Sequence, residues 1–210
     1  MIMRLLAGLS LLLCIVLLGL FGGAGSPFDG TVVRSFALWR SGNPGGTAAA
    51  VLLTHLGGAP FLLAATAVAA VWLLVRHERG RALALTATVL GGRLLIELLK
   101  LATDRPRPAV DAHPVTVFSQ SFPSGHAGNS AITFGALALF ALPERWRVSG
   151  LAAAVLLSGA IGATRPILGV HWPTDVLGGW CLGALWLLLC WTWWRSIDAR
   201  EQQHPVVGRH

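Results

Sequence analysis

Twelve residues of the sequence, Thr164 to Asp175, contain an arginine, a histidine and an aspartate at the junction of two apolar runs. Pro173 is typical of a helix start, so Asp175 is expected in the first turn of a helix and His171 just before it. An aspartate there can hold one imidazole nitrogen and leave the other free to attack. Arg165 would add a phosphate clamp. Taken alone, the stretch is equally typical of a polar loop whose arginine anchors at lipid headgroups.

A second stretch, Lys100 to Pro108, places two cations at the end of another apolar run. Arg107 lies between two prolines, and proline restricts both its own backbone and that of the residue before it, so Arg107 is expected to be held in place. A rigid guanidinium binds phosphate through paired hydrogen bonds, and the flexible ammonium of Lys100 reaches it as a point charge. For either residue alone, the alternative is a cation that extends to the membrane interface.

The third stretch, Phe122 to His126, has the composition of a helix start. Pro123 and Ser124 favour the first positions of a helix, and Gly125 lets an anion approach the backbone closely. The free N–H groups of a helix N-terminus bind anions, and His126 is placed to protonate a leaving oxygen. The alternative is an ordinary serine cap beside an unrelated histidine.

Together the three stretches supply the groups that phosphoryl transfer needs, because that reaction depends on positioning and on donors aimed at the phosphate oxygens. A zinc or two-metal site would instead need several carboxylates or clustered His and Cys ligands, and Asp175 is the only acid close to a histidine in either histidine motif. Metal-free catalysis without a cofactor is therefore favoured. The groups are the cations Lys100, Arg107 and Arg165, the donors Ser124, Gly125 and His126, and the pair His171 and Asp175.

The composition places these groups in a membrane protein. Of the 210 residues, 54% are hydrophobic and 12% are charged, whereas soluble domains have roughly 25% charged residues. The net charge of +7 does not indicate a nucleic-acid partner, because the arginines are scattered between apolar runs and form no continuous stripe. The three cysteines all lie in apolar runs and indicate no disulfide framework.

Six apolar runs approach the roughly 20 residues that a spanning helix needs, which predicts an all-α, integral membrane bundle of six transmembrane helices. The third run is interrupted by Arg93, Glu97 and Lys100 at helical spacing, and the fourth by Asn129 and Ser130, so each of these helices has a polar face that looks into the bundle. An internal structural ion pair between Arg93 and Glu97 is favoured over a catalytic role. The runs cover about 4–22, 58–76, 81–101, 124–142, 147–165 and 174–194.

Arginines in the connecting segments predict the orientation. The joints at 76–81 and 143–147 are rich in arginine and, with six spans, lie on the same side as both termini, which the positive-inside rule makes cytoplasmic. The segments 23–57, 102–123 and 166–173 then face outward, although they include Arg34, Arg40, Arg105 and Arg107. In segment 23–57, residues 31–40 fit either a short amphipathic helix on the outer leaflet or a plain loop. Residues 1–195 are expected to form the membrane domain and 196–210 a polar cytoplasmic tail.

The three stretches together resemble the signature of the type 2 phosphatidic acid phosphatase (PAP2) superfamily, which also includes the vanadium-dependent haloperoxidases. Lys100–x6–Arg107–Pro108 is followed by Pro123–Ser124–Gly125–His126 and then by Arg165–x5–His171–x3–Asp175. The resemblance implies that His171 is a nucleophile oriented by Asp175 and that His126 protonates the leaving group. It implies phosphate binding by Lys100, Arg107, Ser124, Gly125 and Arg165. Thr164 departs from the serine that the family usually has before this arginine.

The sequence thus predicts a lipid phosphatase, metal-independent and located in a bacterial inner membrane with its active site on the extracytoplasmic face. Its expected partner is a phosphorylated lipid that enters laterally from the bilayer. The candidate substrates implied by the resemblance are undecaprenyl diphosphate, phosphatidic acid and phosphatidylglycerol phosphate. The alternatives are a vanadate-binding haloperoxidase-like enzyme and a non-catalytic lipid-phosphate transporter or binding protein. A protein that only binds or transports lipid phosphate would not need a nucleophilic His171.

Overall fold

The computed structural model describes residues 2–109, 114–115 and 119–203, and in these residues the only regular structure is helical. The predicted all-α class is confirmed. The helices are α1 (Ile2–Phe21), α2 (Pro27–Ser41), α3 (Pro44–His55), α4 (Ala59–Val75), α5 (Arg79–Thr103), α6 (Gly125–Ala136) with a π-helical extension η1 (Leu137–Ala141), α7 (Glu144–Ile167) and α8 (Pro173–Gln203).

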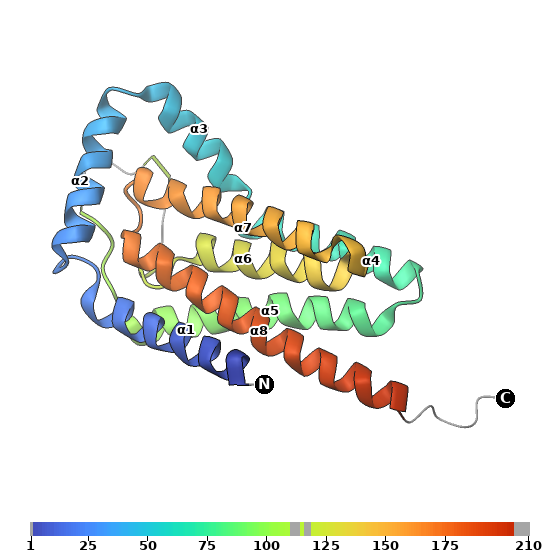
Figure 1. The fold of residues 1–210 in the computed structure, drawn as a ribbon. Coiled ribbons are helices and arrows are strands. Elements are labelled where there is room, and N and C mark those ends of the chain that lie inside the picture. The colour runs from blue at the N-terminus through green and yellow to red at the C-terminus, as the bar shows by residue number, and fades with distance from the viewer. Residues whose placement is uncertain (1, 110–113, 116–118, 204–210) are drawn as a thin grey trace.

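A bundle of lengthwise helices is closed at one end by α2 (Figure 1). The helix α6 lies in the middle of this bundle, because it packs against α5, α7 and α8. Its buried face is made of small and polar residues such as Ala127, Gly128 and Ser130, which allow the neighbouring helices to approach closely. The start of α6, the end of α7 and the start of α8 all lie at the end of the bundle that α2 crosses (Figure 1).

Each of the six predicted apolar runs coincides with a lengthwise helix: α1, α4, α5, α6 with η1, α7 and α8. In the described part of the chain, α5, α7 and the segment Pro173–Asp198 are long and apolar enough to cross a membrane. The helices α3 and α4, which meet at a bend of 40°, make a fourth candidate if they are counted as one span. Six crossings therefore stay a prediction.

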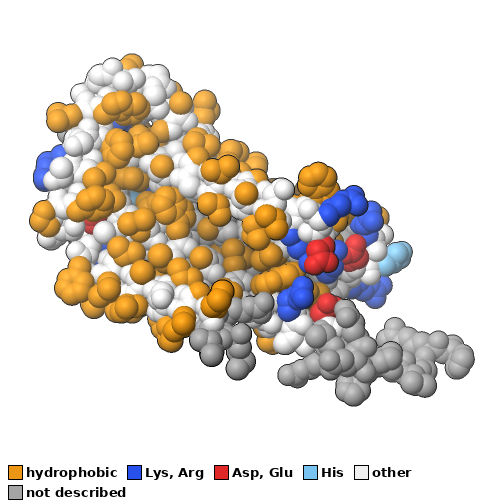
Figure 2. Space-filling model, in the orientation of Figure 1, with side chains coloured by type: hydrophobic (Ala, Val, Ile, Leu, Met, Phe, Trp, Pro, Cys, Tyr) orange, Lys and Arg blue, Asp and Glu red, His pale blue; other side chains and the backbone are white. Residues whose placement is uncertain are grey.

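The outward surface of the bundle is apolar over most of its length, and charged side chains gather at the end where α4 turns into α5 and η1 into α7 (Figure 2). At that end Glu78 pairs with Arg81, and Glu144 lies 3.8 Å from Arg147. Soluble monomers rarely expose a continuous apolar surface of this kind, whereas a lipid bilayer covers one. The large apolar side chains that point outward include Leu9, Leu13, Val68, Val71, Leu83, Leu94, Val155 and Leu156.

The outer segment 23–57 is more ordered than the sequence indicated. The helix α2 includes residues 31–40, so of the two alternatives the structure has the helix; the second helix, α3, was not predicted. The Oγ of Ser26 caps α2 by accepting a hydrogen bond from the N–H of Asp29 at 3.3 Å, with Pro27 at the first helical position. This combination is a recognised helix-start pattern that was overlooked in the sequence.

A buried contact at Asp29 and a partly buried one at Arg40 tie the outer segment to the helices that carry the predicted site. The carboxylate of Asp29, fully buried, accepts hydrogen bonds from the N–H of Thr174 at 3.0 Å and from its hydroxyl at 2.6 Å. Arg40 donates from Nη1 to the carbonyl oxygen of Ile167 at 2.6 Å, at the C-terminal end of α7. The outer segment therefore fixes the end of α7 and the start of α8 relative to each other.

The predicted cytoplasmic tail is helical in its first part, because α8 continues to Gln203 and includes residues 196–203. Residues 204–210 lie outside the described residues. The boundary at 195 between a membrane domain and a tail stays a prediction.

Candidate active site

A cavity of about 260 Å³ is lined by residues of α5, α6 and α7. Residues from all three predicted stretches line it, together with Gly57, in the turn between α3 and α4, and Ala59, the first residue of α4. The predicted site residues that line it are Lys100, Arg107, Gly125, His126, Arg165 and His171.

The remaining two predicted site residues, Ser124 and Asp175, are fully buried beside the cavity and do not line it. Asp175 lies behind His171, with its Oδ2 atom 3.4 Å from the Nδ1 atom of the imidazole. The N–H of Trp172 donates to the same oxygen at 2.9 Å, and the hydroxyl of Ser121 also donates to it. An aspartate in this position favours the imidazole tautomer with its proton on Nδ1 and leaves the lone pair on Nε2.

The Nε2 atom of His171 faces the cations of the cavity. It lies 3.1 Å from the Nη1 atom of Arg107, which also donates to the carbonyl oxygen of Val170 at 2.6 Å. Burial lowers the pKa of His171 well below its ordinary value, and the positive charges of Arg107 and Arg165 lower this pKa further. His171 is therefore neutral at neutral pH, which is the form a nucleophilic nitrogen requires.

Arg105 forms a buried ion pair with Asp175. From the sequence it was predicted only to lie on the outer side of the membrane. Its Nη1 atom lies 2.9 Å from the Oδ1 atom of the aspartate, and its guanidinium stacks over the ring of Phe122 at 4.5 Å. Its Nη2 atom donates to the carbonyl oxygens of Leu18 and Gly19 at the end of α1. Each Asp175 oxygen thus has a partner, and the carboxylate that orients His171 is itself held in place.

Lys100 and Arg107 converge on the short segment 119–120. The Nζ atom of Lys100 donates to the Oγ atom of Ser119 at 3.1 Å and to the carbonyl oxygen of Gln120 at 2.8 Å. Arg107 donates from Nε to the carbonyl oxygen of Ser119 at 2.7 Å. The two cations that the sequence singled out are therefore held near each other by the same loop, as a shared anion site requires.

The N-terminus of α6 begins where the sequence predicts, with Ser124 as its cap residue and Gly125 first in the helix. The Oγ atom of Ser124 is buried, and among the described residues it has no hydrogen-bond partner and no side chain caps the helix. The position of His126 depends on Gly57, because a Cβ atom there would lie 3.1 Å from the His126 ring and 2.4 Å from Ile161. Residue 57 must therefore be small for the imidazole to lie where it does.

Arg165 is almost fully buried at the end of α7. Its Nη1 atom donates to the Oγ1 atom of Thr54 at 2.7 Å, and its Nε atom has no hydrogen-bond partner within the residues that the structure describes. Thr54 is itself buried and belongs to α3, the helix that the sequence did not predict. The outer segment thus holds one of the three cations directly, and the free Nε–H is a donor for a further acceptor.

The predicted ion pair between Arg93 and Glu97 is not formed. Within the part of the chain that the structure describes, neither side chain makes an ion pair or a hydrogen bond, and both line the cavity deeper along α5 than Lys100. The prediction was wrong because helical spacing brings two side chains to one face without making them meet. Here that face is the cavity wall.

Among the residues that the structure describes, no three His, Cys, Asp or Glu side chains lie close enough together to bind a metal ion. The three cysteines are free thiols, as predicted. The cavity is instead dominated by cations and neutral donors, a set that suits an anion and not a divalent cation.

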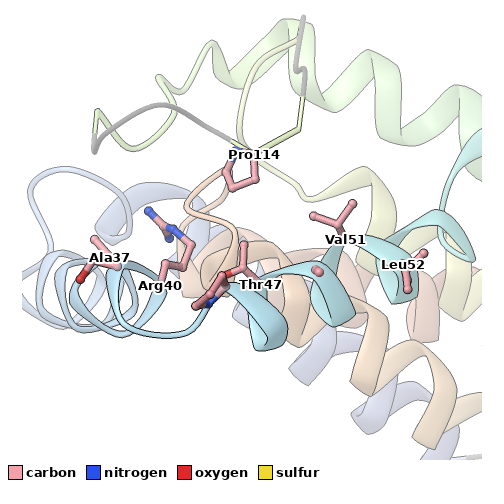
Figure 3. Close-up of a pocket in the computed structure, with 9 residues that line it drawn as sticks. Ala37, Arg40, Thr47, Val51, Leu52 and Pro114 are labelled. Atoms are coloured by element: carbon pink, nitrogen blue, oxygen red, sulfur yellow. The ribbon is translucent and has the colours of Figure 1, made fainter.

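A second, larger hollow of about 760 Å³ lies between α2 and α3 (Figure 3). It is lined mainly by apolar side chains such as Val51, Leu52 and Pro114, with Arg40 at one side. It shares no lining residue with the cavity at His171, so it is a separate feature of the outer segment.

The fold and this cavity define an α-helical protein with an apolar outer surface and a group of cationic side chains at one end of its bundle. Residues 81–198 match the family described as the PAP2 superfamily, and the chain belongs to it. Phosphatidylglycerophosphatase B of Bacillus subtilis is 33% identical over 144 residues, which cover 65% of this chain and 70% of that protein. Lipid A 1-phosphatase of Rhizobium johnstonii is 39% identical over 49% of this chain and 43% of its own length.

A solved structure supports the same assignment over nearly the whole chain. The transmembrane PAP2-type phosphatidylglycerolphosphate phosphatase from Bacillus subtilis superposes with a TM-score of 0.79 at 29% identity, covering 92% of this chain and 96% of that one. The helical fold is therefore that of a transmembrane member of the family, and the protein is an integral membrane protein.

Several residues that shape the site were missed in the sequence, for two different reasons. Arg105 and Ser121 stand next to recognised motif residues, yet nothing in their spacing indicates that both reach Asp175. Thr54 and Asp29 act across long sequence separations, and a buried acid such as Asp29 could have been suspected only from the capping pattern around it. Tertiary contacts, not local signals, give these residues their roles.

Replacing Arg105 with methionine should destabilise the protein by about 3–5 kcal/mol, because Asp175 would stay buried without its cationic partner. Asp175→Asn should also destabilise it, and the double variant should lose less than the sum of the two single losses. Thermal unfolding in detergent, followed by tryptophan fluorescence, measures all three. Arg76→Met is the matched control, since its pair with Glu78 is exposed and worth at most about 1 kcal/mol. Strictly additive losses would show that the two side chains are not coupled.

Proposed function

We propose that the protein is a metal-independent membrane phosphatase that removes a phosphate from a lipid phosphate or diphosphate through a phosphohistidine. The observation that carries the proposal is the placement of His171 between Asp175 on its Nδ1 side and Arg107 on its Nε2 side. A protein that only bound lipid phosphate would need the cations but not an oriented, neutral imidazole. Membership of the PAP2 superfamily and the lipid phosphatases among its relatives support the same conclusion.

In the first step, the Nε2 lone pair of His171 attacks the phosphorus atom, and the bond from phosphorus to the lipid oxygen breaks. His126, on the facing wall, gives its proton to that oxygen, so the lipid leaves as an alcohol or, from a diphosphate, as a monophosphate. Lys100, Arg107 and Arg165 stabilise the charge on the equatorial oxygens, together with the free Oγ–H of Ser124 and the first amide groups of α6. Asp175 stabilises the charge that develops on the imidazole.

In the second step, water attacks the phosphorus atom of the phosphohistidine and the phosphorus–nitrogen bond breaks. His126, now neutral, accepts a proton from the water, which restores it as the acid for the next cycle. Inorganic phosphate is the product and His171 is returned with its lone pair. No redox change occurs, and each proton that His126 donates in the first step is regained in the second.

The proposal includes the orientation in the membrane. The charged end of the bundle carries the arginine-rich joints, so the positive-inside rule assigns it to the cytoplasm and assigns the cavity to the extracytoplasmic face. With six crossings both termini are cytoplasmic, as expected for a bacterial inner-membrane protein. The phosphorylated lipid is the partner.

His171→Ala should lower phosphate release by on the order of a thousandfold or more, because the attacking nitrogen is gone. Release of inorganic phosphate from a lipid phosphate in mixed micelles measures this loss. His55→Ala is the control, since that exposed histidine is the last residue of α3 and its side chain does not line the cavity. Substantial turnover by His171→Ala protein that elutes like the wild type would remove the phosphohistidine from the mechanism.

Vanadate should inhibit the enzyme and EDTA should not. Vanadate resembles the phosphoryl group in transfer and would occupy the same cations, whereas a chelator has nothing to remove from a site built of cations and neutral donors. Initial rates measured with each compound decide the point. Loss of activity in EDTA that returns with Mg²⁺ would support metal-dependent catalysis instead.

The topology predicts that a reporter fused after Arg195 reports a cytoplasmic position. A second reporter inserted at Gly42, between α2 and α3, should report the opposite side of the membrane. Paired fusions of alkaline phosphatase and green fluorescent protein give complementary signals for the two sides. The same location for both sites would overturn the proposed orientation.

A further inference from the structure

The cavity at His171 continues past the phosphate-binding cations into the depth of the bundle, where a second group of polar side chains lines it. Arg93 and Glu97 come from α5, and Asn129 comes from α6. None of the three has a role in the proposed mechanism. Ionisable residues inside a spanning helix are costly, so those without a structural partner are candidates for ligand binding.

These side chains are open to a ligand. Within the described residues, Arg93 and Glu97 form no hydrogen bond and no ion pair. Asn129 is only 6% exposed, and its Oδ1 atom is buried without a hydrogen-bond partner. A buried amide oxygen in that state is costly unless a donor reaches it. The cavity is the space that these groups share.

The polar groups follow a definite order with depth. On α5, Glu97 lies about one helical turn below Lys100, and Arg93 lies about 10 Å below it along the axis. On α6, which runs in the opposite direction, Asn129 lies about one turn below His126. From the phosphate site inward, the cavity therefore presents first cations, then two hydrogen-bond acceptors, and then one further cation.

We infer that these residues form a subsite for a headgroup in which a hydroxylated spacer joins the terminal phosphate to a second, deeper phosphate. The hydroxyl of the spacer donates to Glu97 or Asn129, and the second phosphate binds Arg93. A phosphoglycerol phosphodiester, as in phosphatidylglycerol phosphate, has this order of groups. The inference rests on the proposed function, because it takes the terminal phosphate to be the one transferred to His171.

Two other phosphorylated lipids fit the order less well. In a lipid diphosphate the second phosphate follows the first directly, which would place it against the carboxylate of Glu97 and short of Arg93. Phosphatidic acid has no second phosphate for Arg93 and no free hydroxyl for Asn129. The subsite thus favours the glycerol-linked substrate by attraction at Arg93 and disfavours the diphosphate by repulsion at Glu97.

The lipid has a route to this subsite. The α3–α4 bend of 40° lies beside Gly57 and Ala59, which line the same cavity, and Glu97 of α5 lines it as well and is exposed. Leu94, Leu98 and Leu101 are exposed beside it on α5. A headgroup that enters between the bend and α5 would pass these residues while its acyl chains stay in lipid.

The test compares three lipids in mixed micelles: phosphatidylglycerol phosphate, phosphatidic acid with the same acyl chains, and an isoprenyl diphosphate. Arg93→Gln should raise KM for phosphatidylglycerol phosphate roughly tenfold, the effect of losing one charge-assisted hydrogen bond, and change KM and kcat for phosphatidic acid by less than about twofold. Arg93→Lys should restore part of the loss. Arg79→Gln, at the cytoplasmic start of the same helix, is the matched control and should change neither substrate.

A chemical control tests the hydroxyl contact. Asn129→Ala should raise KM for phosphatidylglycerol phosphate, and this effect should vanish with an analogue whose spacer is propanediol without the hydroxyl. Equal losses on phosphatidic acid and phosphatidylglycerol phosphate in Arg93→Gln protein, or a loss confined to the diphosphate, would overturn the subsite. Wild-type protein that releases phosphate from none of the three lipids would contradict the proposed function, which separates that failure from the failure of the subsite.

Discussion

The buried ion pair between Arg105 and Asp175 is the interaction on which the geometry of the site depends. Burying two charges is costly, and the structure offsets this cost by giving every oxygen of the carboxylate a donor: Arg105 on one side, and Ser121 and the N–H of Trp172 on the other. Arg105 in turn binds carbonyl oxygens at the end of α1 and stacks on Phe122. The first helix, the loop before α6 and the start of α8 therefore meet at one carboxylate, and the orientation of His171 follows from that meeting.

Several positively charged side chains lie close together around this ion pair, and their mutual repulsion lowers the stability of the fold. Lys100, Arg107 and Arg165 line one small cavity, and in the part of the chain that the structure describes none of them forms an ion pair with a carboxylate. Hydrogen bonds to carbonyl and hydroxyl oxygens stabilise part of this charge. Lys100 and Arg107 donate to the loop at 119–120, and Arg165 donates to Thr54. Repulsion remains, and a bound phosphate group would relieve it. Sites that break a local rule of stability in this way are where function is expected.

Much of the fold and of the site could be predicted because the relevant signals are local. The apolar runs gave the lengthwise helices, and proline with serine marked the starts of α6 and α8 at Ser124 and Pro173. Prediction failed where a residue acts through a distant partner, as Thr54 does on Arg165 and Asp29 on Thr174. It failed differently for α3, whose Asn-Pro start is a local signal that was not used, and for α2 the helix was one of two alternatives although a Ser-Pro start marks it. The pairing of Arg93 with Glu97 was inferred from spacing, which defines a shared face and not a contact.

The polar groups of the site differ in how far they lie from the helix ends, and this depth determines how each of them is tolerated in a membrane protein. In the proposed mechanism, His171 and His126 act at helix ends that line the cavity, and a water molecule completes the second step there. Arg93 lies about two turns deeper on α5, where an unpaired guanidinium is tolerated only if it faces a polar cavity. The bend between α3 and α4 lies at this cavity, since Gly57 and Ala59 both line it. The same break lets Gly57 pack against His126, so one interruption of the helix path serves both the position of the imidazole and the proposed entry of the lipid.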